Sequence, residues 1–189
     1  MNKTIFLIKI GKIDSSKIRD LKDDLEVEFN EFNLSVEILK KKIKLKRIYF
    51  DRVNKKYRAP KILDMITKKA NAEGLFRILG ILDKDIYSKD FNFNFGVANI
   101  DSSAALISIS RLRESFYVES SDLYRKLESP EKLNERILKE AKHELGHTFG
   151  LKHCDNICVM HKSNSLADAD KKPVEFCESC FTKINIFLT

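Results

Sequence analysis

All four histidines and all four cysteines of this 189-residue chain lie between His143 and Cys180. The first 142 residues therefore contain no imidazole or thiol that could bind a metal ion. Packing alone does not explain this distribution, because buried cysteines would be spread through the core. We expect an ordinary folded scaffold that is followed by a metal-binding or redox-active C-terminal segment.

The composition is that of a globular protein. Hydrophobic residues make up 43% of the chain and charged residues 33%, and 13 phenylalanines argue against disorder. Only six glycines and three prolines are present, which excludes collagen-like and linker-rich chains. At this length we expect one domain, or at most two small ones.

The net charge of +7 is concentrated in the basic segment, Lys40–Arg58, which has ten Lys and Arg residues and a single acid, Asp51. Such a segment can attract nucleic acid, an anionic membrane or an acidic peptide, and a solvated hairpin has the same composition. Because no aromatic residues are interleaved in the manner of nucleic-acid-binding motifs, we do not expect a nucleic-acid partner. The role of the basic segment stays open.

The N-terminal apolar run Thr4–Ile10 is too short for a signal peptide and is interrupted by Lys9, so we expect it to form a first strand. No stretch reaches the roughly 18 apolar residues that cross a bilayer. We therefore expect a cytoplasmic protein with no membrane partner. In that reducing compartment, clustered cysteines bind metal more often than they form disulfides.

Hydrophobic spacing predicts strands that alternate with helices over the first ~110 residues. Strands are expected at 4–10, 34–38, 43–45, 75–82, 91–95 and 104–109, and helices after Ser15-Ser16, which can cap the first helix, and from Pro60 to near Gly74. The apolar stripes of these two helices are Ile18, Leu21, Leu25 and Phe29 in the first and Ile62, Leu63, Ile66 and Ala70 in the second. This order predicts an α/β fold: a single compact domain with a twisted mixed β-sheet and helices packed on it. Beyond Gly150 regular structure is expected to be weak, so bound metal would have to order that region.

A third helix is predicted to start at Ser129, which can cap it, with Pro130 in its first turn. Gly150 can end this helix in the left-handed conformation. Its apolar residues form one stripe: Leu133, Ile137, Leu138, Ala141 and Leu145. The helix divides the chain into an α/β subdomain, 1–150, and a C-terminal subdomain, 151–189, which we expect to form one folding unit.

The third helix carries the sequence His-Glu-Leu-Gly-His at 143–147. His143 and His147 share one helix face and can bind one ion, while Glu144 lies beside it without being a ligand. A turn at Gly150 can return His153 as a third ligand. Three protein ligands leave a position for water, as in catalytic zinc sites, and Glu144 can act as general base. The alternative is a helix with two histidines that face solvent.

The four cysteines form two short pairs, Cys154 with Cys158 and Cys177 with Cys180. Two such pairs can supply the four thiolates of a tetrahedral structural zinc site. Two disulfides or a redox-active Cys-x-x-Cys at 177–180 are the alternatives. The expected compartment argues against disulfides, and a redox motif would normally have flanking Trp or Pro, so zinc is favoured.

The string His143-Glu144-x-x-His147-x-x-Gly150-x-x-His153 resembles the metzincin metallopeptidases. With a cysteine directly after the third histidine, a Cys-x-Met and a terminal Cys-x-x-Cys, the chain resembles the archaemetzincins, a family of small intracellular metzincin-like proteins. The resemblance implies that Met160 forms the Met-turn beneath the zinc, and we expect His161 to be a surface residue. Cys154 and Cys158 are separated by three residues where the family pattern has four, which affects the geometry of that loop.

This resemblance implies a zinc-dependent endo- or aminopeptidase that acts on a peptide or protein substrate and binds two Zn²⁺ per chain, one catalytic and one structural. Metzincins bind extended peptides along an edge strand. Residues 91–98 are the candidate, with Gly96 allowing close approach of a second backbone, although an internal strand is the alternative. Two other functions stay open: a weak or inactive zinc protein that binds peptides through the same groove, and a Cys₄ zinc domain whose basic segment contacts nucleic acid. Glu144 favours the peptidase, because a scaffold needs no general base.

Overall fold

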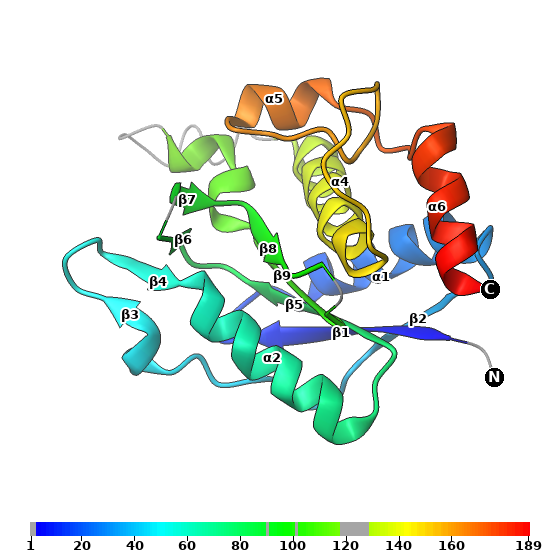
Figure 1. Cartoon of the computed structure of the whole chain (residues 1–189). Helices are drawn as coiled ribbons and strands as arrows, with labels where there is room; N and C mark the ends of the chain where they lie inside the picture. Colours follow the sequence, from blue (N-terminus) through cyan, green and yellow to red (C-terminus); the bar gives the residue numbers. More distant parts are fainter. Residues whose placement is uncertain (1–2, 90, 101, 118–128) are drawn as a thin grey trace.

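Parallel strands form the centre of the computed structural model, which describes residues 3–89, 91–100, 102–117 and 129–189 (Figure 1). The main sheet has the order β2-β1-β5-β9-β8, in which the first four strands are parallel to one another and β8 is antiparallel to β9. Its strands are β1 (Thr4–Ile10), β2 (Ser35–Ile38), β5 (Arg77–Leu82), β8 (Gly96–Ala98) and β9 (Ala104–Ser108). The predicted mixed α/β sheet is confirmed.

A second, smaller sheet, which the sequence did not lead us to expect, lies beside the main one. Its order is β3-β4-β6-β7, and it also mixes parallel and antiparallel pairs. Its strands are β3 (Phe50–Asp51), β4 (Lys56–Arg58), β6 (Ile86–Ser88) and β7 (Phe91–Asn94). The predicted strand at 91–95 thus belongs to this sheet, and the chain enters the main sheet directly afterwards in β8.

Helices cover both faces of the main sheet (Figure 1). The helix α2 (Ala59–Glu73) packs on one face, and α1 (Ser15–Asn30) and α4 (Pro130–Thr148) pack on the other. Along β5, Leu79 and Ile81 belong to the core on the α4 side, whereas Ile78 and Leu82 belong to the core on the α2 side. Burial on both faces explains the continuous apolar run of this central strand.

The predicted helices are confirmed, and one cap differs. All predicted stripe residues of α1, α2 and α4 are buried, and Gly74 ends α2 with a φ of 61°. The Ser129 side chain accepts a hydrogen bond from the Lys132 backbone N–H at 3.3 Å and caps α4 as predicted. In α1, however, the cap is Asp14, whose carboxylate accepts from the Ser16 N–H at 2.9 Å.

Two sequence-based expectations are wrong. The expected strand at 43–45 is reduced to one isolated bridge between Ile43 and Ile10. The region beyond Gly150 contains two helices, α5 (Leu166–Lys171) and α6 (Glu178–Leu188). The α6 sequence is rich in β-branched and aromatic residues, which have modest helix propensity, so tertiary packing must stabilise the helix. Ile184 is fully buried, and the ring centroids of Phe181 and Phe32 lie 4.8 Å apart.

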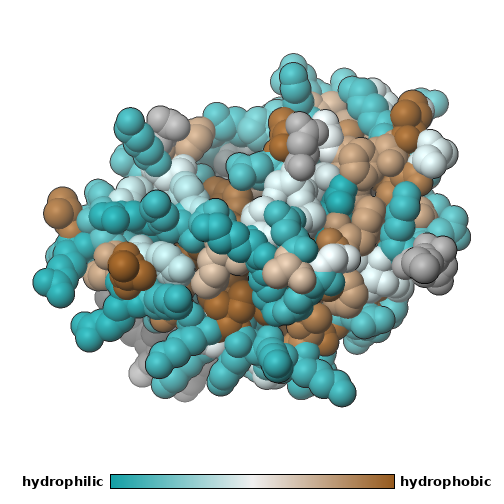
Figure 2. All heavy atoms as spheres, turned by 60° about the horizontal axis from the view of Figure 1, so that its bottom comes forward, coloured by the Kyte–Doolittle hydropathy of each residue, from teal (hydrophilic) through white to brown (hydrophobic). Residues whose placement is uncertain are grey.

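The side of the molecule that carries α2 is largely hydrophilic, with scattered hydrophobic residues (Figure 2). Most side chains of the basic segment are exposed, and its only acid, Asp51, pairs with Arg58 at 3.2 Å. This arrangement agrees with a solvated hairpin. Among the helices in the described part of the chain, none is long and apolar enough to span a bilayer.

Candidate metal centres and active-site pocket

Three histidines converge where α4 ends. His143 and His147 project from one face of the last turns of α4. The chain then reverses at Gly150, whose φ of 84° is the left-handed conformation predicted for it, and His153 returns to the same point. The three rings have centroids 4.8–5.3 Å apart, and their candidate ligand atoms lie within 4.8 Å of one another. The structure therefore brings the three predicted ligands together.

Two backbone carbonyls orient these rings. Nδ1 of His143 lies 2.9 Å from the carbonyl oxygen of Val159, and Nδ1 of His147 lies 2.8 Å from that of Leu151. Because a carbonyl oxygen only accepts, each Nδ1 must carry the proton and each Nε2 must present its lone pair. These two hydrogen bonds leave both Nε2 atoms free to bind a metal ion.

The spacing of these nitrogens fits zinc. The two Nε2 atoms are 3.2 Å apart. Two nitrogens at Zn–N distances of about 2.0–2.1 Å in a tetrahedral shell are separated by about 3.3 Å. Two lone pairs at such a distance repel each other unless a cation lies between them. Burial lowers the pKa of His143 and of His147, which keeps both imidazoles in the neutral form that binds metal.

Glu144 lies next to this cluster with its side chain buried. Burial is the main cause that raises the pKa of its carboxyl well above the usual value; the charge of Glu140 adds to the effect and that of Lys172 opposes it. Across from it lies Gly96 of β8, so Glu144, rather than the backbone of a bound peptide, fills the space that this glycine leaves. Our expectation for Gly96 was therefore wrong.

Met160 packs directly beneath the histidine-bearing turn of α4. It is fully buried, and its sulfur occupies the space that a side chain at Gly146 would need. Its carbonyl oxygen accepts a hydrogen bond from the Cys154 N–H at 3.1 Å, which ties the loop after His153 to this segment. His161 is exposed and belongs to neither of the two candidate ligand groups in the described chain.

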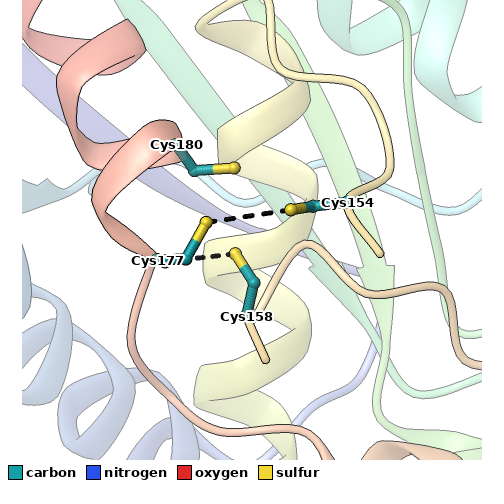
Figure 3. A group of neighbouring side chains, drawn as sticks. All are labelled: Cys154, Cys158, Cys177 and Cys180. Carbon is teal, nitrogen blue, oxygen red and sulfur yellow. Dashed lines mark hydrogen bonds between the residues drawn. The ribbon is translucent and has the colours of Figure 1, made fainter. Parts of the chain in front are cut away.

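The four cysteines form a second cluster in which the four sulfur atoms converge (Figure 3). Cys154 and Cys158 come from the loop after α4, and Cys177 and Cys180 come from the start of α6. The sulfur atoms of Cys154 and Cys177 are 3.7 Å apart. Tetrahedral Zn–S bonds of about 2.3 Å place two sulfurs about 3.8 Å apart, whereas a disulfide requires about 2.05 Å. The thiols therefore have the spacing of metal ligands.

Backbone N–H groups surround these sulfurs in the way that thiolates require. The sulfur of Cys158 accepts from the N–H groups of Met160 and Cys177 at 3.4 and 3.3 Å. Burial raises the pKa of Cys177, but hydrogen bonds from the Cys180 backbone, Asn156 and Cys154 outweigh it and lower this pKa to about 6. The three-residue spacing between Cys154 and Cys158 is thus compatible with a closed four-sulfur cluster.

A pocket of about 470 Å³ opens onto the histidine cluster. It is lined by β7 and β8, by the inward face of α4, and by the segment 162–164 together with Lys172. The candidate edge, 91–98, is therefore at the pocket, with β8 at the edge of the main sheet and the Phe95 ring buried.

Several polar residues in the wall of this pocket were not predicted from the sequence, among them Glu140, Ser163 and Lys172. Only Glu140 had a usable signal, because it precedes Glu144 by one helical turn and must share its face. Lys172 sits in a polar, irregular segment whose position depends on tertiary contacts.

The long histidine motif on a mixed α/β scaffold, next to a four-cysteine cluster, defines a metzincin-like zinc metallopeptidase. The family model for peptidase family M54 matches residues 1–186. Archaemetzincin from Pyrococcus furiosus is 36% identical over 186 residues, which cover 97% of this chain and 93% of that protein. Archaemetzincin from Archaeoglobus fulgidus is 48% identical over 106 residues, 56% of this chain and 58% of that protein.

Solved structures show the same fold. The crystal structure of archaemetzincin from A. fulgidus complexed with malonate has a TM-score of 0.76 and 33% identity, covering 95% of this chain and 99% of that one. A zinc-dependent peptidase from Methanocorpusculum labreanum has a TM-score of 0.81 and 27% identity, covering 96% and 100%. The chain belongs to peptidase family M54, the archaemetzincin family of zinc metallopeptidases.

Proposed function

We propose that the chain hydrolyses peptide bonds, with His143, His147 and His153 as ligands of a catalytic zinc ion and Glu144 as general base. The observation that carries the proposal is the convergence of three imidazoles beside a buried carboxylate in the wall of an open pocket. When bound, zinc supplies Lewis-acid chemistry, which polarises the scissile carbonyl and makes water a stronger acid.

In this proposal Glu144 moves the proton. Its buried carboxylate accepts a proton from the attacking water and donates it to the leaving nitrogen. Burial and the neighbouring Glu140 raise the pKa of Glu144, which makes it a stronger base than an exposed glutamate. Close packing against Gly96 restricts the side chain to the position from which it acts.

We propose that an extended peptide or protein segment binds antiparallel to β8. Among the described residues this strand is the last of the main sheet, so its outer edge can form main-chain hydrogen bonds with a peptide. The pocket runs along the same strand and reaches the histidine cluster. Both endo- and aminopeptidase cleavage are compatible with this arrangement.

We propose that the four cysteines hold a second, structural zinc ion, which gives two ions per chain. In this view residues 151–189 are a zinc-stapled subdomain, with Met160 as the Met-turn, within one folding unit. A shared core supports this view, since Leu151, Met160 and Ile184 belong to the same buried cluster as Leu7 and Leu79. Reduced thiols at metal-ligand spacing also support action in the reducing cytoplasm.

The decisive test is digestion of a peptide library by the zinc-loaded wild type and by a Glu144→Ala variant. Removal of a general base should lower kcat/KM by about 10²–10⁴-fold with an unchanged zinc content. The matched control is Glu131→Ala, an exposed glutamate at the start of the same helix, which should leave cleavage intact. Equal cleavage by the wild type and Glu144→Ala, or no cleavage by either of these two proteins at several pH values, would contradict catalysis by this site. The latter result would favour an inactive zinc protein that binds peptides through the same groove.

Metal analysis of protein purified without any chelator tests separately whether the second zinc ion is present. Two zinc ions per chain are expected, and one or none would contradict the two-site proposal.

A further inference from the structure

Four buried polar atoms that lack a hydrogen-bond partner in the described chain line the pocket at the histidine cluster. They are Asn94 Oδ1, Glu140 Oε2, Ser163 Oγ and Lys172 Nζ. Only two other buried side-chain atoms of the described residues lack a partner, Arg77 Nε and Ser103 Oγ, and neither residue lines this pocket. A buried polar atom without a partner destabilises the folded state, because it has lost its hydrogen bonds to water. Their concentration in one pocket therefore indicates a place that is built to bind a polar group.

Two of these atoms carry opposite charges. Lys172 and Glu140 are 5% and 4% exposed, although lysine and glutamate are rarely buried. Lys172 Nζ lies 3.6 Å from Glu140 Oε2, which is an ion pair but is beyond hydrogen-bond distance. The ammonium thus keeps N–H donors, and the carboxylate keeps one acceptor oxygen, for a group that enters the pocket.

This pair lies close to the proposed general base. Glu140 precedes Glu144 by four residues on α4, so the two side chains lie on one face, one helical turn apart, and they are hydrogen-bonded to each other. A ligand that reaches both Lys172 and Glu140 therefore occupies the position next to the peptide bond on which Glu144 would act.

The charges and hydrogen-bonding capacity of the four atoms indicate which type of substrate side chain can bind here. An acidic side chain would be repelled by Glu140 and Glu144, and a basic side chain would be repelled by Lys172. A hydrocarbon side chain would leave all four polar atoms without partners. A carboxamide adds no charge, accepts from the Lys172 ammonium through its oxygen, and donates to Glu140 or Asn94 through its nitrogen.

We propose that Lys172 and Glu140 form a specificity subsite for the carboxamide side chain of Gln or Asn next to the cleaved bond. This inference rests on the proposed peptidase function, because it assigns a substrate class to the same pocket. Lys172 and Glu140 are specificity-determining residues in this scheme, and Glu144 remains the proton carrier.

The test uses two matched series on the zinc-loaded full chain. One is a set of peptides that differ only in having Gln, Glu, Leu or Lys next to the cleaved bond, compared by kcat/KM. The other is a set of dipeptide hydroxamates with the same four side chains, compared by Kd, which reports the subsite without turnover. The wild type should favour Gln over Leu by about ten- to hundredfold in both series, because only the Gln side chain can form hydrogen bonds with the charged groups of Lys172 and Glu140.

The first variant is Lys172→Met, which keeps the length of the side chain and removes the ammonium. It should abolish the preference for Gln over Leu in both kcat/KM and Kd. This ratio is the diagnostic quantity, because loss of the Lys172 charge also acts on Glu144 and so affects cleavage of every peptide. Lys172→Met leaves the buried Glu140 carboxylate without its ion-pair partner, which can unfold the protein. In that case the double variant Glu140→Gln/Lys172→Met removes both charges together, and it should also lose the preference for Gln. The control is Lys171→Met, which removes the exposed neighbouring lysine and should retain it.

The outcomes separate the two proposals. Cleavage that depends on Glu144 but is indifferent to Gln would overturn the subsite and leave the peptidase function standing. Selective binding of the Gln hydroxamate without cleavage of any peptide would support the subsite and contradict the peptidase. A wild-type preference for Glu or Lys ligands, or a preference for Gln that survives in both variants, would also overturn the assignment.

Discussion

Gly96 of β8 faces the side chain of Glu144 on α4 at contact distance. A β-carbon built on Gly96 would lie 2.5 Å from Cγ and 2.8 Å from Oε1 of Glu144. Real β-carbons do not approach other atoms so closely, so these two residues constrain each other. The edge strand of the main sheet thereby sets the position of the carboxylate that we propose as general base.

Gly96→Ala should therefore displace Glu144 while leaving the histidines in place. We expect kcat/KM for a cleavable peptide to fall at least tenfold at an unchanged zinc content. Overpacking at such a contact costs about 1–3 kcal/mol. At this chain length that corresponds to a fall in Tm of roughly 2–4 °C per kcal/mol.

A double-mutant cycle gives the control for this contact. In a Glu144→Ala background the space is free, so adding Gly96→Ala should lower Tm by much less than it does in the wild type. Equal losses of Tm in the two backgrounds would show that the clash involves another group.

Met160 should support the histidine cluster through packing alone. Because it is fully buried against Gly146, Met160→Ala should lower the free energy of unfolding by about 2–5 kcal/mol. Met160→Leu keeps the volume and should cost less than about 1.5 kcal/mol. Chemical denaturation of the zinc-loaded proteins measures both values, and similar losses for Ala and Leu would contradict a packing role.

Loss of the four-cysteine site should also weaken the histidine site. His153 and Cys154 are consecutive, and the Cys154 N–H donates a hydrogen bond to the Met160 carbonyl oxygen. Disorder of the cysteine loop should therefore also displace His153, a proposed ligand of the other ion. We expect Cys177→Ser to release one zinc outright and to lower the affinity of the second at least tenfold.

Metal analysis during stepwise chelation measures this coupling. Ser179→Ala changes an exposed serine in the same turn of α6 and should retain both ions. Full retention of the histidine-bound zinc in Cys177→Ser would show that the two sites are independent.

Acid should weaken the contact that holds α5 to α4. The guanidinium of Arg136 is buried and bonds to Asp170 through Nε and Nη2, at 2.5 and 2.7 Å. The hydrogen bonds from Arg136 are the main cause that holds the pKa of Asp170 below 3.8. A lowered pKa stabilises the fold at pH values above 3.8, and the contribution is lost as the pH falls through the folded-state value.

Asp170→Asn should therefore be less stable than the wild type at neutral pH, by about 2 kcal/mol. The difference should shrink when unfolding is followed at pH values below 3.8. Asp64→Asn removes an exposed carboxylate that pairs with Lys68 and should cost under about 0.5 kcal/mol. A deficit for Asp170→Asn that is constant from pH 7 to pH 2 would exclude titration of this carboxyl as the cause.

Local periodicity and spacing were sufficient to predict much of this molecule. The stripes of α1, α2 and α4 follow from a helical period, and the continuous apolar run of β5 follows from burial on two faces. His143 and His147 must share a helix face, Gly150 can turn the chain, and paired cysteines have short loops. Each of these statements depends on residues a few positions apart, where backbone geometry leaves few alternatives.

Only the tertiary structure decided which distant residues meet. Helix α6 forms because Ile184 and Phe181 find a core to pack against, although their intrinsic preference for a helix is weak. Gly96 and Glu144 come from different segments of the chain, as do Glu140 and Lys172, and no short-range pattern links either pair. The sequence by itself determined the two sets of candidate metal ligands and the helix that carries most of the first set. The shape and polarity of the pocket depend on long-range packing, which places the side chains of separate segments against one another.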